Sequence, residues 1–196
     1  MARRNDHTRD QLIALTLDAV KSFLESKSHH ELSLRKVATM IGYVPSTLVN
    51  VFGNYNLLLL RVVANTLDEL SMLAQQSVAT ATDNRDALKK LAYLYHDFAC
   101  DNPHRWQLIF AHSMNGEQLP EWQANRIDGM TGMLEHLLVN IGENKSCDEV
   151  VEASRVLWAG VHGITMLSVD DKFFSRQPMD GKALIDNLLD SYLSSW

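Results

Sequence analysis

The sequence lacks any long apolar run. Stretches such as Leu57–Leu60 are far shorter than the roughly 20 apolar residues that a membrane-spanning helix needs. The N-terminus carries Arg3 and Arg4, and no apolar block follows them as it would in a secretion signal. We therefore expect a protein that neither crosses a membrane nor is secreted.

Cysteine is also scarce. Cys100 and Cys147 are two isolated thiols, and they do not have the spacing of a cysteine metal motif. Two unpaired thiols suit a reducing compartment. We expect a cytoplasmic protein with no metal site, in which both cysteines are inert and partly buried.

Motifs that carry enzymatic chemistry are missing as well. The sequence has no GxGxxG, no P-loop, no HExxH and no CxxC, and no nucleophile, base and orienting acid at motif spacing. His162, beside Gly160 and Gly163, is the residue that most suggests catalysis, but a lone histidine on an apolar helix is more often a hydrogen-bonded core residue or a ligand contact. We predict no enzyme, no catalytic residues and no cofactor; an all-α enzyme remains an alternative.

Alternating strand patterns and internal repeats are absent too, whereas helical periodicity runs through the chain. With 46% hydrophobic residues, 196 residues can bury a real core. We predict an all-α protein of about nine helices, and we place His29 and His30 on the surface of a polar link. The helices that we expect outside residues 33–53 are Thr8–Ser26, Asn54–Ala79, Asp86–Cys100, Pro103–Ser113, Pro120–Ile141, Cys147–Val169 and Gly181–Ser195, with loops at Thr80–Arg85, Gly142–Asn144 and Arg176–Pro178.

Residues 33–60 have the outline of a helix-turn-helix. Ser33 can cap a helix, and Leu34, Val37, Ala38 and Ile41 follow at the spacing of one apolar face. Gly42 then supplies a helix stop, because glycine takes a left-handed backbone at little cost. The pattern predicts a short first helix followed by a tight turn.

Pro45 suits the first turn of the next helix, and Gly53 ends it. Leu48, Val51 and Phe52 give this helix an inward face, which leaves Ser46, Thr47, Val49 and Asn50 facing outward. A short helix of this kind can read the major groove of DNA. The alternative is an ordinary helical hairpin within a core.

The segment Ile41–Asn54 resembles the TetR family of transcriptional regulators, with its Gly turn, its Thr-Leu in the recognition helix, and Phe-Gly before the long fourth helix. The chain departs from the family at Val49, Val51 and Tyr55, where Tyr, His and Lys are usual. The resemblance implies a DNA-binding domain at 1–54 and an effector-binding and dimerisation domain at 55–196. The DNA-contacting residues that we predict are Arg35, Ser46, Thr47, Val49, Asn50, Asn54 and Tyr55, and Arg3 and Arg4 can reach DNA as a basic arm.

A second resemblance covers Tyr95–Phe110 and Trp158–Gly163, which are similar to a TetR subclass with a Trp-x-x-x-His-Gly motif late in the chain. This part is rich in aromatic and methionine side chains, which can enclose an apolar cavity between helices. We predict that an effector contacts residues from this set, with Arg105 as a further polar candidate: Tyr95, Phe98, Trp106, Phe110, His112, Met130, Met133, Trp158, His162 and Met166.

Charge is unevenly divided along the chain. Residues 1–61 hold eight Lys and Arg against five acidic residues, whereas the rest of the chain is strongly acidic. The basic part coincides with the expected helix-turn-helix, as phosphate binding requires. The resemblance implies a repressor that responds to a small-molecule effector and binds a near-palindromic operator as a homodimer.

The same resemblance implies that the last two long helices form the dimer. Their apolar residues outnumber what one small body needs: Val151, Leu157, Val161, Ile164, Leu167, Leu184, Leu188, Leu189 and Tyr192. The alternative to a regulator is a ligand-binding helical protein that has lost DNA recognition, which the departures at Val49, Val51 and Tyr55 favour.

Overall fold

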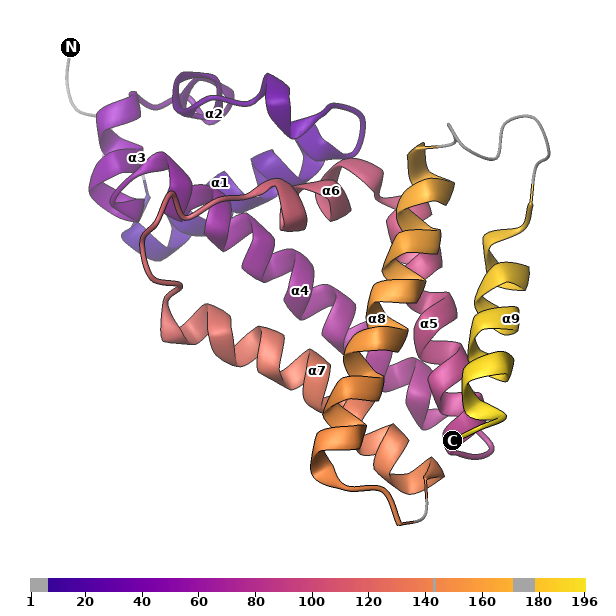
Figure 1. The fold of residues 1–196 in the computed structure, drawn as a ribbon. Helices are drawn as coiled ribbons and strands as arrows, with labels where there is room; N and C mark the ends of the chain where they lie inside the picture. The colour runs from indigo at the N-terminus through magenta and orange to yellow at the C-terminus, as the bar shows by residue number, and fades with distance from the viewer. Residues whose placement is uncertain (1–6, 143, 171–178) are drawn as a thin grey trace. The chain divides into compact units, whose positions relative to one another are not determined.

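The computed structural model describes residues 7–142, 144–170 and 179–196, and within them it contains nine α-helices and no strand (Figure 1). The expected all-α fold of about nine helices is confirmed. The helices are α1 (Arg9–Leu24), α2 (Leu34–Met40), α3 (Pro45–Phe52), α4 (Tyr55–Ala79), α5 (Asn84–Asp101), α6 (Pro103–Ala111), α7 (Glu121–Ile141), α8 (Cys147–Asp170) and α9 (Gly181–Leu193).

Three of the sequence predictions concern residues outside the described ranges. These are the basic arm with Arg3 and Arg4, the centre of the loop at Gly142–Asn144, and the loop at Arg176–Pro178. In the part of the chain that is described, no helix is both long enough and apolar enough to cross a membrane.

The chain divides into two compact units. Unit 1 is formed by residues 1–67 and 104–119, and unit 2 by residues 68–103 and 120–196. Helix α4 contributes residues to both units, because it runs without interruption from Tyr55 to Ala79. The chain thus leaves unit 1 within α4 and returns to it with α6.

Unit 1 is organised by helix caps and a small apolar core. Thr8 and Gln11 form a reciprocal capping box at the start of α1, with Gln11 Oε1 accepting from Thr8 N at 2.9 Å. Ser33 caps α2 by accepting from Lys36 N at 3.2 Å. The core beneath these caps contains Leu12, Val20, Leu24, Val37, Ala38, Leu48, Leu58, Trp106 and Leu108.

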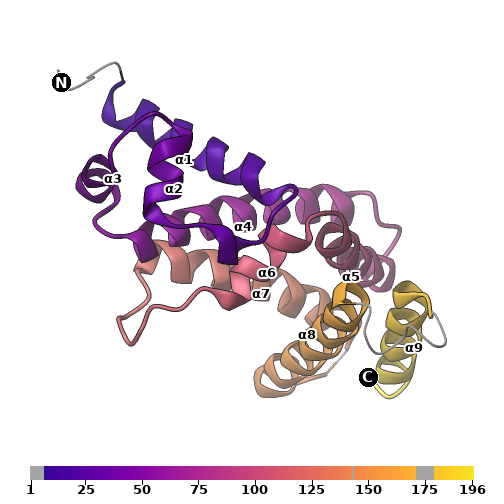
Figure 2. The same ribbon diagram turned by 90° about the horizontal axis from the view of Figure 1, so that it is seen from above.

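Unit 2 is a helical bundle in which α5, α8 and α9 lie side by side and α7 packs against α5 and α8 (Figures 1 and 2). Its core includes Leu88, Leu138, Leu157, Ile185 and Leu189. Arg126 of α7 forms a bidentate ion pair with Asp68 of α4, at 2.8 and 2.9 Å. This pair fixes the orientation of α7 against the second half of α4.

Two expectations about surface exposure were wrong. Cys100 and Cys147 are both exposed rather than partly buried, because each lies near a helix end. His29 belongs to a short 3₁₀ turn, His29–Glu31, and is half-buried rather than on the surface. Burial, together with the nearby His30 and His104, lowers the pKa of His29.

Candidate functional site

The turn between α2 and α3 is fixed by backbone geometry. Gly42 has a φ of 75°, a left-handed conformation that glycine adopts at little cost. Tyr43 N donates to Ala38 O at 2.9 Å, which closes the C-terminus of α2. The Tyr43 hydroxyl also lies 2.7 Å from His7 Nδ1, so the turn is attached to the start of α1.

Helix α3 is held in place from its inner face and its C-terminus. Pro45 occupies its first turn, as the sequence predicts. Leu48 is 0% exposed, while Val51 and Phe52 are half-buried. Arg9 Nη2 donates to Val51 O at 3.1 Å, which satisfies a carbonyl at the helix end. Gly53 follows in a left-handed conformation, with φ 91°.

The residues predicted to contact DNA differ in their exposure. Ser46, Val49 and Asn50 are exposed on α3, and Arg35 is exposed on the first turn of α2. Thr47 is half-buried. The outward face of α3 is therefore small and polar apart from Val49, which is 40% exposed.

Two further predicted DNA contacts, Asn54 and Tyr55, lie at the start of α4. Asn54 is exposed, and its Oδ1 accepts from Leu57 N at 2.8 Å, so its side chain caps the helix. Tyr55 is half-buried, and this burial raises the pKa of its hydroxyl. Tyr55 therefore stays neutral and has less surface to offer a phosphate than an exposed lysine would have.

A pocket of about 140 Å³ lies within unit 2, between α5, α7, α8 and α9. Helix α5 lines it with one stripe at i, i+3, i+4 and i+7 spacing. The lining residues are Leu88, Leu91, Ala92, Tyr95, Met130, Thr131, Leu134, Ser154, Arg155, Leu157, Trp158, Val161 and Leu189. Most of this surface is apolar, as is usual for a small-molecule site.

An aromatic group lies at one side of the pocket. The Tyr95 hydroxyl is 2.7 Å from His162 Nδ1, and the Trp158 ring stacks on the His162 ring with centroids 5.2 Å apart and planes 15° apart. Burial lowers the pKa of His162, which keeps its imidazole neutral at physiological pH. A neutral imidazole provides one hydrogen-bond donor and one acceptor, and this arrangement fixes the position of Trp158 at the pocket.

The structure brings together some of the residues predicted to contact an effector and separates others. Tyr95, Met130 and Trp158 line the pocket, and His162 contacts two of them. The other predicted residues of unit 2 do not line it: Phe98 is buried, Met133 is half-buried and Met166 is exposed.

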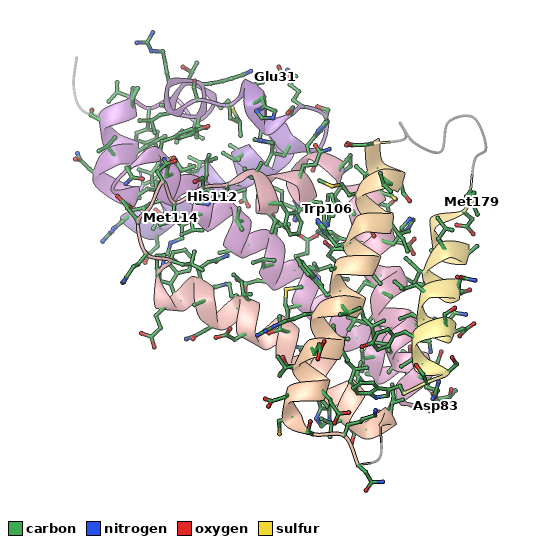
Figure 3. All side chains as sticks on the ribbon, in the orientation of Figure 1. Glu31, Asp83, Trp106, His112, Met114 and Met179 are labelled. Carbon is green, nitrogen blue, oxygen red and sulfur yellow. The ribbon has the colours of Figure 1, made fainter. Side chains whose placement is uncertain are left out.

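The remaining predicted effector residues belong to unit 1. Trp106 is 1% exposed, Phe110 is exposed, and Arg105 is buried (Trp106 and His112 are labelled in Figure 3). His112 Nε2 lies 3.0 Å from Asn56 O. The Trp106 ring also contacts the Phe110 ring at its edge, and none of these four residues lines the pocket of unit 2.

Sequence reasoning missed most of the pocket wall, including Leu88, Ala92, Leu134 and Arg155. Aromatic and methionine residues favour the prediction of a cavity, whereas leucines and alanines at helical spacing are equally typical of a packed core and of a pocket wall. Helical spacing could have identified part of this wall. Leu88, Leu91 and Ala92 lie on the same face of α5 as Tyr95, which the sequence did predict as a pocket residue.

The apolar residues predicted to form the dimer mostly contact their own chain. Leu157, Val161 and Leu189 are buried in the core of unit 2, and Ile164, Leu188 and Tyr192 pack against that core. The residues of α8 that face away from the core of unit 2 are not the predicted ones. They form an outer stripe of Val156, Ala159 and Met166, which are exposed, and Gly163, which is half-buried. A Cβ atom added at Gly163 would meet no atom within 4 Å.

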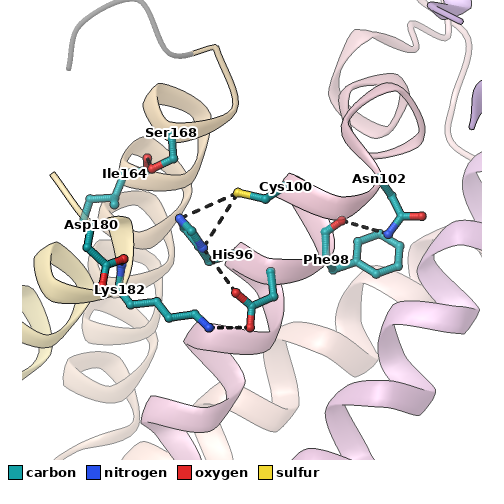
Figure 4. Close-up of polar contacts among 9 residues, drawn as sticks. His96, Phe98, Cys100, Asn102, Ile164, Ser168, Asp180 and Lys182 are labelled. Carbon is teal, nitrogen blue, oxygen red and sulfur yellow. Dashed lines mark hydrogen bonds and ion pairs between the residues drawn. The ribbon is translucent and has the colours of Figure 1, made fainter. Parts of the chain in front are cut away.

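A cluster of polar side chains lies at the start of α9 in unit 2 (Figure 4). Lys182 Nζ donates to Asp97 Oδ2 at 2.7 Å, and the Asp180 side chain accepts from Lys182 N at 3.0 Å. His96 lies 3.7 Å from Asp97 and 3.9 Å from Cys100 Sγ. These contacts attach α9 to α5. Within the described residues, no group of three or more His, Cys, Asp or Glu could hold a metal ion.

Comparison with known proteins identifies the family. Residues 88–192, more than half of the chain, match the family model described as "Tetracyclin repressor-like, C-terminal domain". The chain belongs to the TetR family. Similar solved structures include TetR family transcriptional regulators, and this TetR-family chain has their helical fold. No curated protein matches its sequence significantly.

Solved structures share this TetR fold at low sequence identity. A protein of unknown function from Rhodococcus sp. RHA1 has a TM-score of 0.78 at 17% identity, covering 99% of this chain and 98% of that one. The TetR family transcriptional regulator PfmR from Thermus thermophilus has a TM-score of 0.62 at 16% identity, with coverages of 91% and 97%. The regulator FadR from Bacillus subtilis, solved with stearoyl-CoA, has a TM-score of 0.69 at 14% identity, with coverages of 93% and 98%.

Proposed function

We propose that this TetR-family protein is a cytoplasmic transcriptional repressor that binds a near-palindromic operator as a homodimer and releases it when a small molecule occupies the pocket of unit 2. The observation that carries the proposal is the outward face of α3. Ser46 and Asn50 are exposed on a short helix that Leu48 and Arg9 hold against the rest of unit 1. A helix positioned in this way, with short polar side chains, suits the major groove.

Individual contacts follow from the chemistry of these side chains. Asn50 can pair with an adenine edge, and Thr47 can contact a phosphate or a thymine methyl group. Arg35 on α2 and Asn54 at the start of α4 are exposed, which suits contact with the phosphate backbone. The net positive charge of residues 1–61 supports the same face.

Dimerisation is supported by the outer stripe of α8. Val156 and Met166 are 46% and 47% exposed, and Ala159 and Gly163 between them allow a second helix to approach closely. A two-fold axis through α8 and α9 would produce a self-complementary interface. The dimer would then present two copies of α3 to successive major grooves, about 34–36 Å apart.

Coupling between effector and DNA is assigned to α4. This helix has residues in both units, so a change in its position can alter the spacing of the two recognition helices. An effector acts only through a difference in affinity between the binding and non-binding spacings. Effector binding and operator binding would therefore weaken each other by the same factor.

The deciding experiment measures binding of the purified protein to a duplex from the upstream region of its own gene. Asn50→Ala should weaken binding by about 1–3 kcal/mol, or roughly 5- to 150-fold. Asn65→Ala is the matched control, because Asn65 is an exposed asparagine of unit 1 on α4 outside the predicted contact set. Failure of an intact wild-type dimer to bind any upstream duplex at low salt would refute the repressor function.

A second candidate function is a ligand-binding protein with weakened DNA recognition. Val49 is exposed where the family usually has a phosphate-binding tyrosine, and Val51 and Tyr55 are half-buried. Val44, before α3, is also apolar and 60% exposed. If Thr47→Ala and Asn50→Ala both left regulation of the upstream promoter unchanged, this second function would replace the first.

A further inference from the structure

The polar groups that line the pocket of unit 2 indicate the class of molecule that it takes. Arg155 is the one charged residue among the 13 described residues that line it, and no Asp, Glu or Lys is among them. The remaining wall is apolar except for three hydroxyl-bearing side chains and the indole N–H of Trp158. The electrostatics of the wall therefore favour a neutral or anionic ligand over a cation.

The three hydroxyl groups already have hydrogen-bond partners. Tyr95 is bonded to His162, Thr131 Oγ1 donates to Ile127 O at 3.2 Å, and Ser154 Oγ donates to Val151 O at 2.8 Å. Arg155, in contrast, makes no hydrogen bond or ion pair with any described residue, and its side chain is exposed. Its guanidinium is the charged lining group with donors left for a ligand.

The exposure of the lining residues distinguishes the closed end of the pocket from its open side. Leu88, Ala92, Leu157 and Leu189 are buried and form its floor. Arg155, Thr131 and Trp158 are exposed and line it, so they lie on its open side. A ligand that matches this wall has an apolar body against the buried floor. It has a hydrogen-bond acceptor at the open side, or mouth, beside Arg155.

The size of the pocket limits the apolar body. Its volume is about 140 Å³. A dry protein cavity of roughly 150 Å³ holds one benzene molecule. A single ring or a short branched chain fills this space, and the remainder of a long acyl chain would have to lie outside it.

We propose that the pocket binds a small monocarboxylate with a compact apolar body of about six carbon atoms, a size set by the benzene comparison. Its carboxylate pairs with Arg155 at the mouth, because a planar guanidinium bonds a carboxylate bidentately. Its ring or chain lies against Ala92, Leu157 and Leu189. This assignment rests on the proposed function, in which the pocket is the effector site.

Titration calorimetry on the full-length protein tests charge and size together. Benzoate, benzamide and benzylamine share a ring and differ in charge, and stearoyl-CoA is the probe of size. We expect benzoate to bind more tightly than benzamide, benzylamine to bind most weakly of the three, and stearoyl-CoA to bind no more tightly than benzoate. Equal affinities for the three ring compounds, or a preference for stearoyl-CoA, would overturn the assignment.

Variants at the mouth then test the role of Arg155. Arg155→Gln should weaken benzoate binding roughly tenfold, as the loss of a charge-assisted pair predicts, and leave benzamide binding unchanged. Arg155→Lys should restore part of the loss. Glu152→Gln is the control, since Glu152 is exposed on the same helix and does not line the pocket. This substitution changes the net charge of the protein in the opposite direction to Arg155→Gln.

A purely long-range charge effect would make Glu152→Gln strengthen benzoate binding as much as Arg155→Gln weakens it, and would refute the contact. The DNA-binding assay on the same preparation separates the two proposals. Binding of benzoate without DNA binding would overturn the repressor function and leave the pocket assignment standing. Binding of DNA without any preference for the carboxylate would overturn the pocket assignment alone.

Discussion

At the scale of single residues, His162 makes stability depend on pH. Burial lowers its pKa in the folded protein, so the unfolded chain takes up the proton first as the pH falls below about 6.5. Stability is therefore complete at neutral pH and is lost as the pH falls from about 6.5 towards the folded-state pKa. The loss should be modest, because His162 is half-buried rather than fully enclosed.

The test compares urea unfolding of wild type and His162→Gln between pH 7 and pH 5. Glutamine does not titrate in this range and can still hydrogen bond to Tyr95. We expect the stability of wild type to fall more steeply with acidification than that of the variant. His29, whose pKa burial also lowers, is present in both proteins and cancels in the difference. Parallel pH profiles would contradict this role for His162.

The residue scale is also where sequence reasoning was least complete. Tyr95, Met130 and Trp158 could be predicted as pocket residues because large side chains between helices often border cavities. Arg155 could not, because an exposed arginine on a helix usually has no function beyond solvation. Trp106 and His112 do not line the pocket because residues 104–119 belong to unit 1, which nothing in a linear sequence shows.

At the scale of structural elements, the helix-turn-helix depends on Gly42. A Cβ atom there would meet nothing within 4 Å, so the cost of substitution comes from the left-handed backbone alone. Gly42→Ala should lower the free energy of unfolding by roughly 1–2 kcal/mol, whereas Gly42→Asn should cost less because asparagine tolerates this conformation. Chemical denaturation of both variants provides the comparison, and equal losses would show that the turn is not the cause.

Gly181 at the start of α9 is constrained for a different reason. A Cβ atom at this position would collide with His96 Nε2 and lie 2.7 Å from Ser168 Oγ. Gly181→Ala should therefore move α9 or destabilise unit 2 by about 1–3 kcal/mol, as overpacking does. Gly132→Ala on α7 is the control, since its Cβ would meet no atom and should stabilise the helix by up to about 1 kcal/mol. Thermal unfolding that ranked the two variants in the opposite order would contradict this account.

Most elements were predictable because their ends are marked by local chemistry. Ser33, Pro45 and Gly53 each fix a helix boundary through caps, φ preference or a left-handed stop. The predicted C-terminal ends were less accurate: the last helix ends at Leu193 rather than Ser195, and α6 ends at Ala111 rather than Ser113. Helix C-termini without glycine carry no comparable signal, since their final turns are decided by packing.

At the scale of the whole molecule, the dimer is tested by charge placed on the outer stripe of α8. Val156→Arg should give a monomer at micromolar concentration, because a buried unpaired guanidinium opposes the interface. Val139→Arg is the matched control, because Val139 is 55% exposed on α7 and lies outside that stripe. Light scattering after gel filtration measures the mass of each variant, and a dimeric Val156→Arg protein would exclude this face.

Unit 1 is assembled from two separate stretches of the chain, residues 1–67 and 104–119. Trp106 and Leu108, from the second stretch, are both 1% exposed. A chimera made with one crossover after α4 would thus join a foreign α6 to this helix-turn-helix and leave its core mismatched. Exchange of operator specificity between relatives is therefore expected to need a double crossover, which limits how such proteins can be recombined in evolution or in the laboratory.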